Sequence, residues 1–249
     1  FTNKAANELK ERLERMLGPA VSRDVWACTF HSACVRILRR DIDKLGLSRD
    51  FTIYDTDDAK RLIKDCLKEL SLEEKTFPPR EVLSAISNAK DAMVDPSAYQ
   101  KQADTMGDWR RQRIGKVYAL YNKKLWDANA LDFDDIILHT VRLLQSSPET
   151  LAYYQHRFRY VLIDEYQDTN HLQYLLAHLL AGEYENICVV GDDDQSIYRF
   201  RGANIENILG FEKDYRHART IRLEQNYRST QHILDAANAV IRNNRGRKG

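Results

Sequence analysis

The stretch Tyr160–Asn170, YVLIDEYQDTN, constrains the fold of this chain more than any other. It opens with apolar residues that do not alternate with polar ones, which is the pattern of a strand buried on both faces of a parallel sheet. Asp164 and Glu165 follow directly, where the strand ends. Because open parallel sheets bind ligands at the carboxyl ends of their strands, the sequence predicts an α/β domain with an acidic site at that edge.

The two carboxylates suggest a particular chemistry. An aspartate in this position can bind Mg²⁺ through oxygen, with waters and substrate phosphates completing the coordination shell. A neighbouring glutamate can accept a proton from an attacking water. Together they favour metal-assisted attack on a phosphate, as in nucleotide hydrolysis. The alternative is an acidic turn that ends a core strand, and these two residues alone leave both interpretations open.

Composition excludes several classes of protein. Lys plus Arg is 38 and Asp plus Glu is 37, so the net charge of +1 gives no overall attraction to nucleic acid and any such binding needs local patches. The four cysteines contain no CxxC pair, which predicts neither a zinc site nor a disulfide framework and fits a cytoplasmic location. No apolar run approaches the ~18 residues of a membrane span, so no membrane partner is expected. Both ends look cut, and we expect a piece of a longer protein.

Three more stretches have the apolar pattern of strands: Val25–Thr29, Ile187–Val190 and Thr220–Leu223. A helix is predicted after each of them. Thr29 and His31 would lie on the first strand-to-helix turn, at the functional edge of such a sheet. A role facing the ligand and a purely structural role both remain open for His31.

Between Tyr54 and Asn129 the pattern predicts only helices. Roughly 130 residues separate the strand at Val25 from the strand at Tyr160, whereas a crossover between parallel strands usually needs a single helix. We interpret the excess as an all-helical subdomain inserted into the α/β domain. The expected organisation is residues 1–53 and 130–218 for the first domain, 54–129 for the insertion and 219–249 for the start of a second domain.

The insertion is rich in basic residues, and their role has two interpretations. A solvated helix face is one, and a patch that binds backbone phosphates is the other. The residues concerned are Arg110, Arg111, Arg113, Lys116, Lys123 and Lys124.

The loop after Ile187–Val190 carries the second group of candidate residues. Gln195 lies at the same predicted sheet edge as Asp164, where an amide can orient water or contact a terminal phosphate. Arginine and aromatic residues then alternate up to Arg201, which is typical of a surface that stacks single-stranded bases; a hydrophobic staple is the alternative. Arg228 lies near a predicted helix start. It is either an arginine finger, which projects from a separate unit toward a phosphate, or a solvated or salt-bridged side chain.

Several segments, in this order, carry a family resemblance: FTNKAA, TFHS, LDFDD, LIDEYQDTN, VVGDDDQSIYRFRGAN and LEQNYRST. They resemble the UvrD/Rep/PcrA-type helicases of superfamily 1. The resemblance implies a RecA-like P-loop NTPase domain with a helical insertion, followed by a second RecA-like domain, with ATP bound between them. It also implies ATP-dependent 3′-to-5′ translocation on single-stranded DNA and action at duplex junctions, in DNA repair or replication.

The resemblance implies roles for individual residues. Asp164 would bind Mg²⁺, Glu165 would activate the hydrolytic water and Gln195 would contact the γ-phosphate of ATP. Arg228 would be the finger from the second domain, and Tyr227 would stack on adenine. Phe200 stands where many relatives have tryptophan, and stacking should survive because any base offers a π-face to phenylalanine too. The residues that would line the DNA track are Phe1, Thr2, Asn3, Thr29, His31, Tyr198, Phe200 and Arg201.

One departure affects the expected activity. The phosphate-binding loop GxxxxGK[ST] is absent, and Gly115-Lys116 is no substitute because Val117 follows it inside a predicted helix. We expect this loop before Phe1 and expect the piece alone to be inactive. Besides a piece of an ATP-dependent helicase, a non-catalytic single-stranded DNA-binding module and the helicase part of a helicase-nuclease are the alternatives. Retention of Asp164, Glu165, Gln195 and Arg228 favours the enzyme over the binding module.

Overall fold

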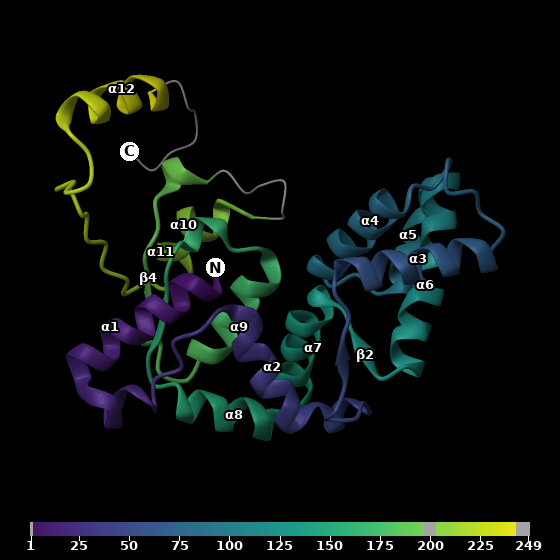
Figure 1. The fold of residues 1–249 in the computed structure, drawn as a ribbon, viewed down its shortest axis with the longest axis horizontal. Coiled ribbons are helices and arrows are strands. Elements are labelled where there is room, and N and C mark those ends of the chain that lie inside the picture. Colours follow the sequence, from purple (N-terminus) through teal and green to yellow (C-terminus); the bar gives the residue numbers. More distant parts are fainter. Residues whose placement is uncertain (1, 197–202, 243–249) are drawn as a thin grey trace.

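The computed structural model describes residues 2–196 and 203–242. Two groups of helices lie side by side, and the described strands form two small parallel sheets (Figure 1). The predicted α/β class with parallel strands is therefore present in outline, although helices predominate.

The first group of helices contains α3, α4, α5 and α6, and it confirms the helical prediction for this part of the chain. Aspartates cap three of the helices through side-chain oxygens that accept backbone N–H groups, which satisfies donors that a helix start leaves free. Apolar side chains from these helices form a closed core. The bounds are α3 Thr56–Glu69, α4 Pro79–Asp91, α5 Pro96–Met106 and α6 Trp109–Asp127.

Two short strands, one before and one after this helical group, pair with each other in parallel. Strand β1 (Thr52–Ile53) precedes α3, and strand β2 (Ala130–Leu131) follows α6. Thr52 pairs with Ala130 and Ile53 pairs with Leu131. The chain therefore leaves and re-enters the rest of the molecule on neighbouring strands (Figure 1).

The second group of helices surrounds a separate core. Asp132 caps α7 through a capping box with Asp135. Gly46, with a φ of 88°, ends the turn that continues α2, a conformation that only glycine adopts freely. The bounds are α2 Phe30–Asp41, the 3₁₀ turn η1 Ile42–Leu45, α7 Phe133–Ser146, α8 Pro148–Arg157 and α9 His171–Ala181.

The second sheet pairs β3 (Val161–Ile163) with β4 (Ile187–Val189) in parallel. Ile163 is buried and belongs to the same apolar cluster as Ala177 of α9. Leu162 points to the other face and is 75% exposed. The prediction of a strand buried on both faces is therefore wrong here, because packing covers only one face of the sheet among the described residues.

The other two predicted strands do not form. Between Val25 and Thr29 the chain is irregular, and the ring of Trp26 packs against Phe158 with centroids 5.0 Å apart. Thr220–Leu223 runs without a partner strand in the described chain. Cross-strand pairs supply most of the stability of a sheet, so an apolar stretch with no neighbouring strand has little to hold it as a strand.

The first and last helices of the described chain bury little of their surface. Helix α1 (Asn3–Ser22) is capped by Thr2, and its backbone leaves the helical conformation at Gly18. Neither α1 nor α12 has a buried residue. The remaining helices are α10 Glu206–Leu209, α11 Phe211–Asp214 and α12 Gln231–Ile241.

Candidate active site

The two carboxylates stand on an exposed turn at the carboxyl end of β3. The Oδ1 atom of Asp164 accepts a hydrogen bond from the backbone N–H of Glu165 at 3.0 Å. Glu165 has a φ of 52° and a ψ of 43°, a left-handed conformation that is costly for a residue with a side chain and is enriched at functional sites. The turn thus presents both carboxylates to solvent at the edge of the sheet.

The donor set of this turn fits a magnesium ion. Mg²⁺ commonly binds proteins through one or two carboxylates and keeps waters or substrate phosphates as its other ligands. Asp164 supplies one such carboxylate on an exposed turn. Among the residues that the structure describes, no group of three or more His, Cys, Asp or Glu side chains converges as metal ligands.

Gln167 joins this turn to the loop that follows β4. It belongs to the short 3₁₀ helix η2 (Tyr166–Asp168), and only 1% of its surface is exposed. Its Nε2 donates to Oε2 of Glu165 at 2.9 Å, and its Oε1 accepts the backbone N–H of Asp192 at 3.1 Å. One buried carboxamide therefore links the two segments that carry candidate catalytic groups.

The loop after β4 is folded on itself around Asp192. Gln195 lies at the end of the 3₁₀ helix η3 (Asp193–Gln195), and its Nε2 donates to Oδ2 of Asp192 at 2.6 Å. The other carboxylate oxygen of Asp192 accepts the backbone N–H of Asp194 at 3.0 Å. The structure brings Gln195 to the sheet edge of Glu165 through Asp192 and Gln167, and the role of Gln195 at a phosphate stays a prediction.

A second set of hydrogen bonds connects the segment after η2 to α10. The side-chain Nδ2 of Asn207 donates to the backbone oxygen of Thr169 at 3.0 Å and to its Oγ1 at 3.1 Å. The N–H of Asn204 donates to the same backbone oxygen at 2.9 Å. Both Thr169 and Asn207 are buried, so these bonds are shielded from water.

We expect Asn207→Ala to lower the free energy of unfolding by about 1–3 kcal/mol, because it removes buried hydrogen bonds at a site that water cannot easily fill. Urea unfolding of the chain, followed by circular dichroism, measures the change. The comparison variant is Asn204→Ala, whose exposed side chain accepts the N–H of Glu206. An Asn207→Ala chain no less stable than Asn204→Ala would contradict this account.

The described residues of the predicted DNA track lie in two places. Thr29 caps α2, and the half-buried ring of His31 meets Phe133 edge-on with centroids 5.8 Å apart. Burial lowers the pKa of His31, although a hydrogen bond with the backbone of Phe133 opposes the shift. Thr2 and Asn3 are exposed at the start of α1. The remaining predicted track residues, Phe1, Tyr198, Phe200 and Arg201, lie outside the described residues.

Tyr227 and Arg228 are not brought to the carboxylates. The ring of Tyr227 is 93% exposed, and the backbone N–H of Arg228 donates to Oδ1 of Asn226 at 2.9 Å. Neither residue forms a hydrogen bond or ion pair with Glu165 among the contacts of the described chain. Both precede α12, which follows an extended segment away from the sheets (Figure 1).

The basic residues of the helical group are mostly engaged locally. Arg110 pairs with Glu81 at 2.7 Å, and Lys124 pairs with Glu69 at 2.7 Å. Lys123 pairs with an aspartate on its own helix. These contacts favour the interpretation of a charged, solvated surface over a phosphate-binding patch.

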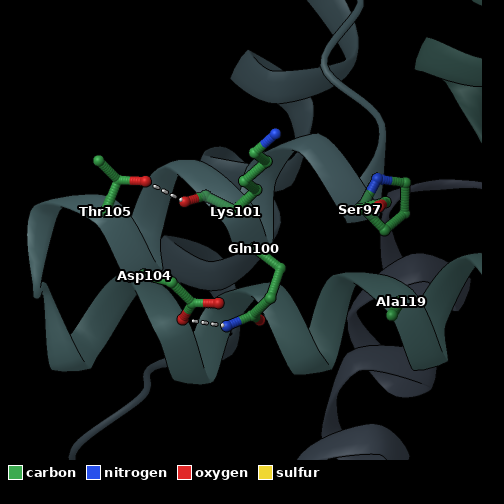
Figure 2. A pocket seen from close by; sticks show the side chains of 7 residues that line it. Ser97, Gln100, Lys101, Asp104, Thr105 and Ala119 are labelled. Atoms are coloured by element: carbon green, nitrogen blue, oxygen red, sulfur yellow. Dashed lines mark hydrogen bonds between the residues drawn. The ribbon is translucent and has the colours of Figure 1, made fainter.

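An open depression of about 570 Å³ lies on α5 and α6, far along the chain from the candidate carboxylates. Three of its polar side chains form hydrogen bonds within α5: Figure 2 shows Gln100 bonded to Asp104 and Thr105 bonded to the backbone oxygen of Lys101. It contains none of the predicted site residues. The depression therefore adds no candidate group to the site at β3 and β4.

A buried lysine connects the two groups of helices. Nζ of Lys90, at the end of α4, lies 2.7 Å from carboxylate oxygens of both Asp132 and Asp135 at the start of α7. The hydroxyl of Tyr121 donates to Asp132 at 2.8 Å. Lys90 is fully buried and the two aspartates nearly so.

Lys90 affects the pKa values of the two aspartates differently. Burial would raise the pKa of Asp132, but the Lys90 ammonium outweighs it, and the pKa is lowered. Burial and the negative charge of Asp132 raise the pKa of Asp135 to about 7. The arrangement thus pairs one ammonium with one ionised carboxylate, while the second carboxyl group holds its proton more tightly than usual.

Comparison with known proteins defines the class. Residues 1–216 match the UvrD/REP helicase N-terminal domain, and the chain belongs to that family. The predicted resemblance is confirmed. In the part of the chain that the structure describes, no helix is long and apolar enough to span a bilayer.

The most similar relatives that we found are all named ATP-dependent DNA helicase PcrA. Identity is 55% to the protein of Bacillus subtilis (strain 168) over 248 residues, which is 100% of this chain and 33% of the relative. It is 53% to the protein of Staphylococcus aureus (strain Mu50), with the same shares, and 53% to that of Staphylococcus epidermidis, where the share of the relative is 34%. The chain spans about a third of the length of these relatives.

Sequence reasoning missed two residues that the structure brings to the candidate groups. Gln167 was passed over between Glu165 and Asp168 of DEYQD, although a buried amide beside a candidate catalytic carboxylate is a natural orienting group. Phe133 was not among the predicted site residues, yet it is 48% exposed and its ring lies beside His31. An apolar ring in the first turn of a helix with acidic neighbours was the available signal.

Proposed function

We propose that this chain is part of a longer protein, called here the parent protein, that acts as an ATP-dependent 3′-to-5′ DNA helicase or single-stranded DNA translocase. One observation carries the proposal: Asp164 and Glu165 stand exposed on a strained turn, and Gln167 ties that turn to the loop that holds Gln195. Family membership supports the same activity.

Each residue of the proposed site has a chemical task. Asp164 holds Mg²⁺, and that ion, when bound, neutralises charge on the phosphates of ATP. Glu165 accepts the proton of the attacking water, and Gln195 orients that water or contacts the γ-phosphate. Arg228 supplies a positive charge to the transferred phosphate, and Tyr227 stacks on adenine. These last two tasks require the segment before α12 to approach the site.

We also propose that the sheets belong to a RecA-like domain made of residues 1–53 and 130–218. Residues 54–129 form its helical insertion, and residues 219–249 begin a second RecA-like domain. The pairing of β1 with β2 supports the insertion, because both of its ends then lie on neighbouring strands of one structure. All four cysteines are free thiols, which is consistent with the proposed cytoplasmic location.

Single-stranded DNA and duplex junctions are the proposed partners. Stacking on aromatic rings binds single strands with little sequence preference. The exposed ring of Phe133 beside His31 offers one such surface, and a neutral His31 can accept or donate a hydrogen bond there. Thr2, Asn3 and Thr29 belong to the same proposed track, together with Phe1, Tyr198, Phe200 and Arg201.

The function is tested with the parent protein and this chain side by side. We expect the parent protein to hydrolyse ATP in the presence of single-stranded DNA and to unwind a duplex with a 3′ single-stranded tail, measured by phosphate release and strand displacement. The 249-residue chain should show no DNA-stimulated hydrolysis, because it lacks a phosphate-binding loop. A parent protein that binds DNA but never hydrolyses ATP would support the binding-module alternative instead.

A further inference from the structure

Gln167 lies between the two segments that carry the proposed catalytic groups, and we propose that it is a positioning residue for Glu165. The inference rests on the proposed function, because it assigns Gln167 a part in the hydrolysis of ATP. Its carboxamide is buried, and it contacts the Glu165 carboxylate on one side and the backbone of Asp192 on the other.

The chemistry of an amide suits this position. The carboxamide of a glutamine has an oxygen that accepts and an NH₂ group that donates. A contact at its oxygen therefore fixes the direction in which the NH₂ group points. The N–H of Asp192 can only face the oxygen of Gln167, which directs the NH₂ group toward Glu165. A hydrogen bond to a charged acceptor is stronger than one between neutral groups, and it restricts a carboxylate that is otherwise exposed to solvent.

The loop after β4 is shaped to permit this contact. A Cβ atom at Gly191 would lie 2.6 Å from Oε1 of Gln167 and 3.2 Å from the backbone nitrogen of Tyr166. A side chain there would push the loop away from η2. Glycine at this position lets the backbone of Asp192 reach the amide, so both segments contribute to the contact.

Acidic side chains lie near Glu165 in the part of the chain that the structure describes. Asp164 precedes it, and burial together with the charge of Glu165 raises the pKa of Asp168 on η2. Asp192 directs its carboxylate toward Gln195 and the N–H of Asp194. Gln167 is thus a neutral donor among carboxylates that repel Glu165, and its removal would leave Glu165 free to turn outward.

The test uses two substitutions in the parent protein. Gln167→Glu keeps an oxygen that accepts the N–H of Asp192 but replaces the donor to Glu165 with a repelling carboxylate. Gln167→Met keeps the length of the side chain and removes both contacts. We expect either change to lower the kcat of DNA-stimulated ATP hydrolysis by a factor of about 10–100, the value of a hydrogen bond to a charged group.

The matched control is Gln173→Glu, the same change at another buried glutamine. Gln173 lies in the first turn of α9 and accepts the N–H of Asn170 at 3.1 Å, a contact that glutamate maintains. We expect its kcat to stay within about twofold of the unaltered protein. For the two Gln167 variants we expect KM for ATP and the Kd of a non-hydrolysable ATP analogue to change by less than about twofold, because the contact acts on the water-activating group and not on nucleotide binding.

Combination with Glu165→Gln separates positioning from folding. If Gln167 acts through Glu165, adding Gln167→Met to Glu165→Gln should leave kcat unchanged, since effects of residues that act as a unit do not add. Thermal melting of each variant shows whether the protein remains folded, and Gln167→Met serves if the buried charge of Gln167→Glu prevents folding. Unchanged kcat in a folded Gln167 variant, or a further loss in the double variant, would overturn the positioning role. Absence of ATP hydrolysis in the unaltered parent protein would instead overturn the proposed function.

Discussion

Glu165→Gln in the parent protein is expected to reduce ATP hydrolysis by a factor on the order of 10² or more, because glutamine cannot accept the proton of the attacking water. Binding of ATP should remain nearly intact, since glutamine keeps the size of the side chain and can still accept from Gln167. Steady-state phosphate release with single-stranded DNA measures the first quantity, and equilibrium binding of a fluorescent ATP analogue measures the second.

Glu185→Gln is the matched control for this substitution. Glu185 is also a glutamate with a left-handed backbone, with a φ of 51°. It precedes β4, at the opposite end of the strand from the loop that contains Gln195. We expect full hydrolysis from this control. Unchanged DNA-stimulated turnover in Glu165→Gln would remove Glu165 from the mechanism, and equal losses in both variants would indicate a general effect of the change.

Lys90→Met should have the largest effect on stability, lowering the free energy of unfolding by about 3–5 kcal/mol, because it leaves buried carboxyl groups without their cation. Asp132 and Asp135 both lie 2.7 Å from the lost ammonium. Urea unfolding followed by circular dichroism measures the change in the 249-residue chain. Lys124→Met removes a pair at the surface and should cost less than about 1 kcal/mol.

A double substitution shows where the cost of Lys90→Met arises. Asparagine at position 132 still caps α7 and removes the carboxylate that is ionised beside Lys90. We therefore expect Asp132→Asn to recover part of the stability lost in Lys90→Met. A double variant no more stable than Lys90→Met would show that lost packing, and not an unpaired charge, sets the cost.

The starts of several helices can be predicted from the sequence. Asp55, Asp95, Asp108 and Asp132 each accept a backbone N–H within three residues. Such contacts involve only near neighbours in the chain, so they can be read from the order of residues. The break at Gly18 in α1 follows from the same local chemistry.

Strands were predicted less well, because their partners are distant in the sequence. The stretches at 161–163 and 187–189 pair with each other, whereas those at Val25–Thr29 and Thr220–Leu223 find no partner in the described chain. All four are short stretches that contain apolar residues suited to a strand. The pattern shows that a stretch can be a strand, but the presence of a neighbouring strand decides whether it becomes one.

Among the functional and buried polar residues, too, those with a local sequence signal were predictable and those with distant partners were not. The position of Asp164 and Glu165 was predictable because an apolar run ends directly before them. Lys90 ends an amphipathic helix, where lysine usually faces solvent, and no local signal distinguishes it from such a lysine. Its partners Asp132 and Asp135 are distant in the sequence, as Asp192 is from Gln167. Contacts of this kind appear only once the chain is folded.

The ladder between β1 and β2 has a consequence for how this fold can vary. Neighbouring strands lie about 4.8 Å apart, so any segment whose ends meet at that spacing can replace the helices between them, and the entropic cost rises only slowly with its length. We therefore expect that the helical group can change in size without displacing the sheets. A replacement without Lys90 would also have to neutralise Asp132 and Asp135, so the sequence of α7 limits which segments can replace the helical group.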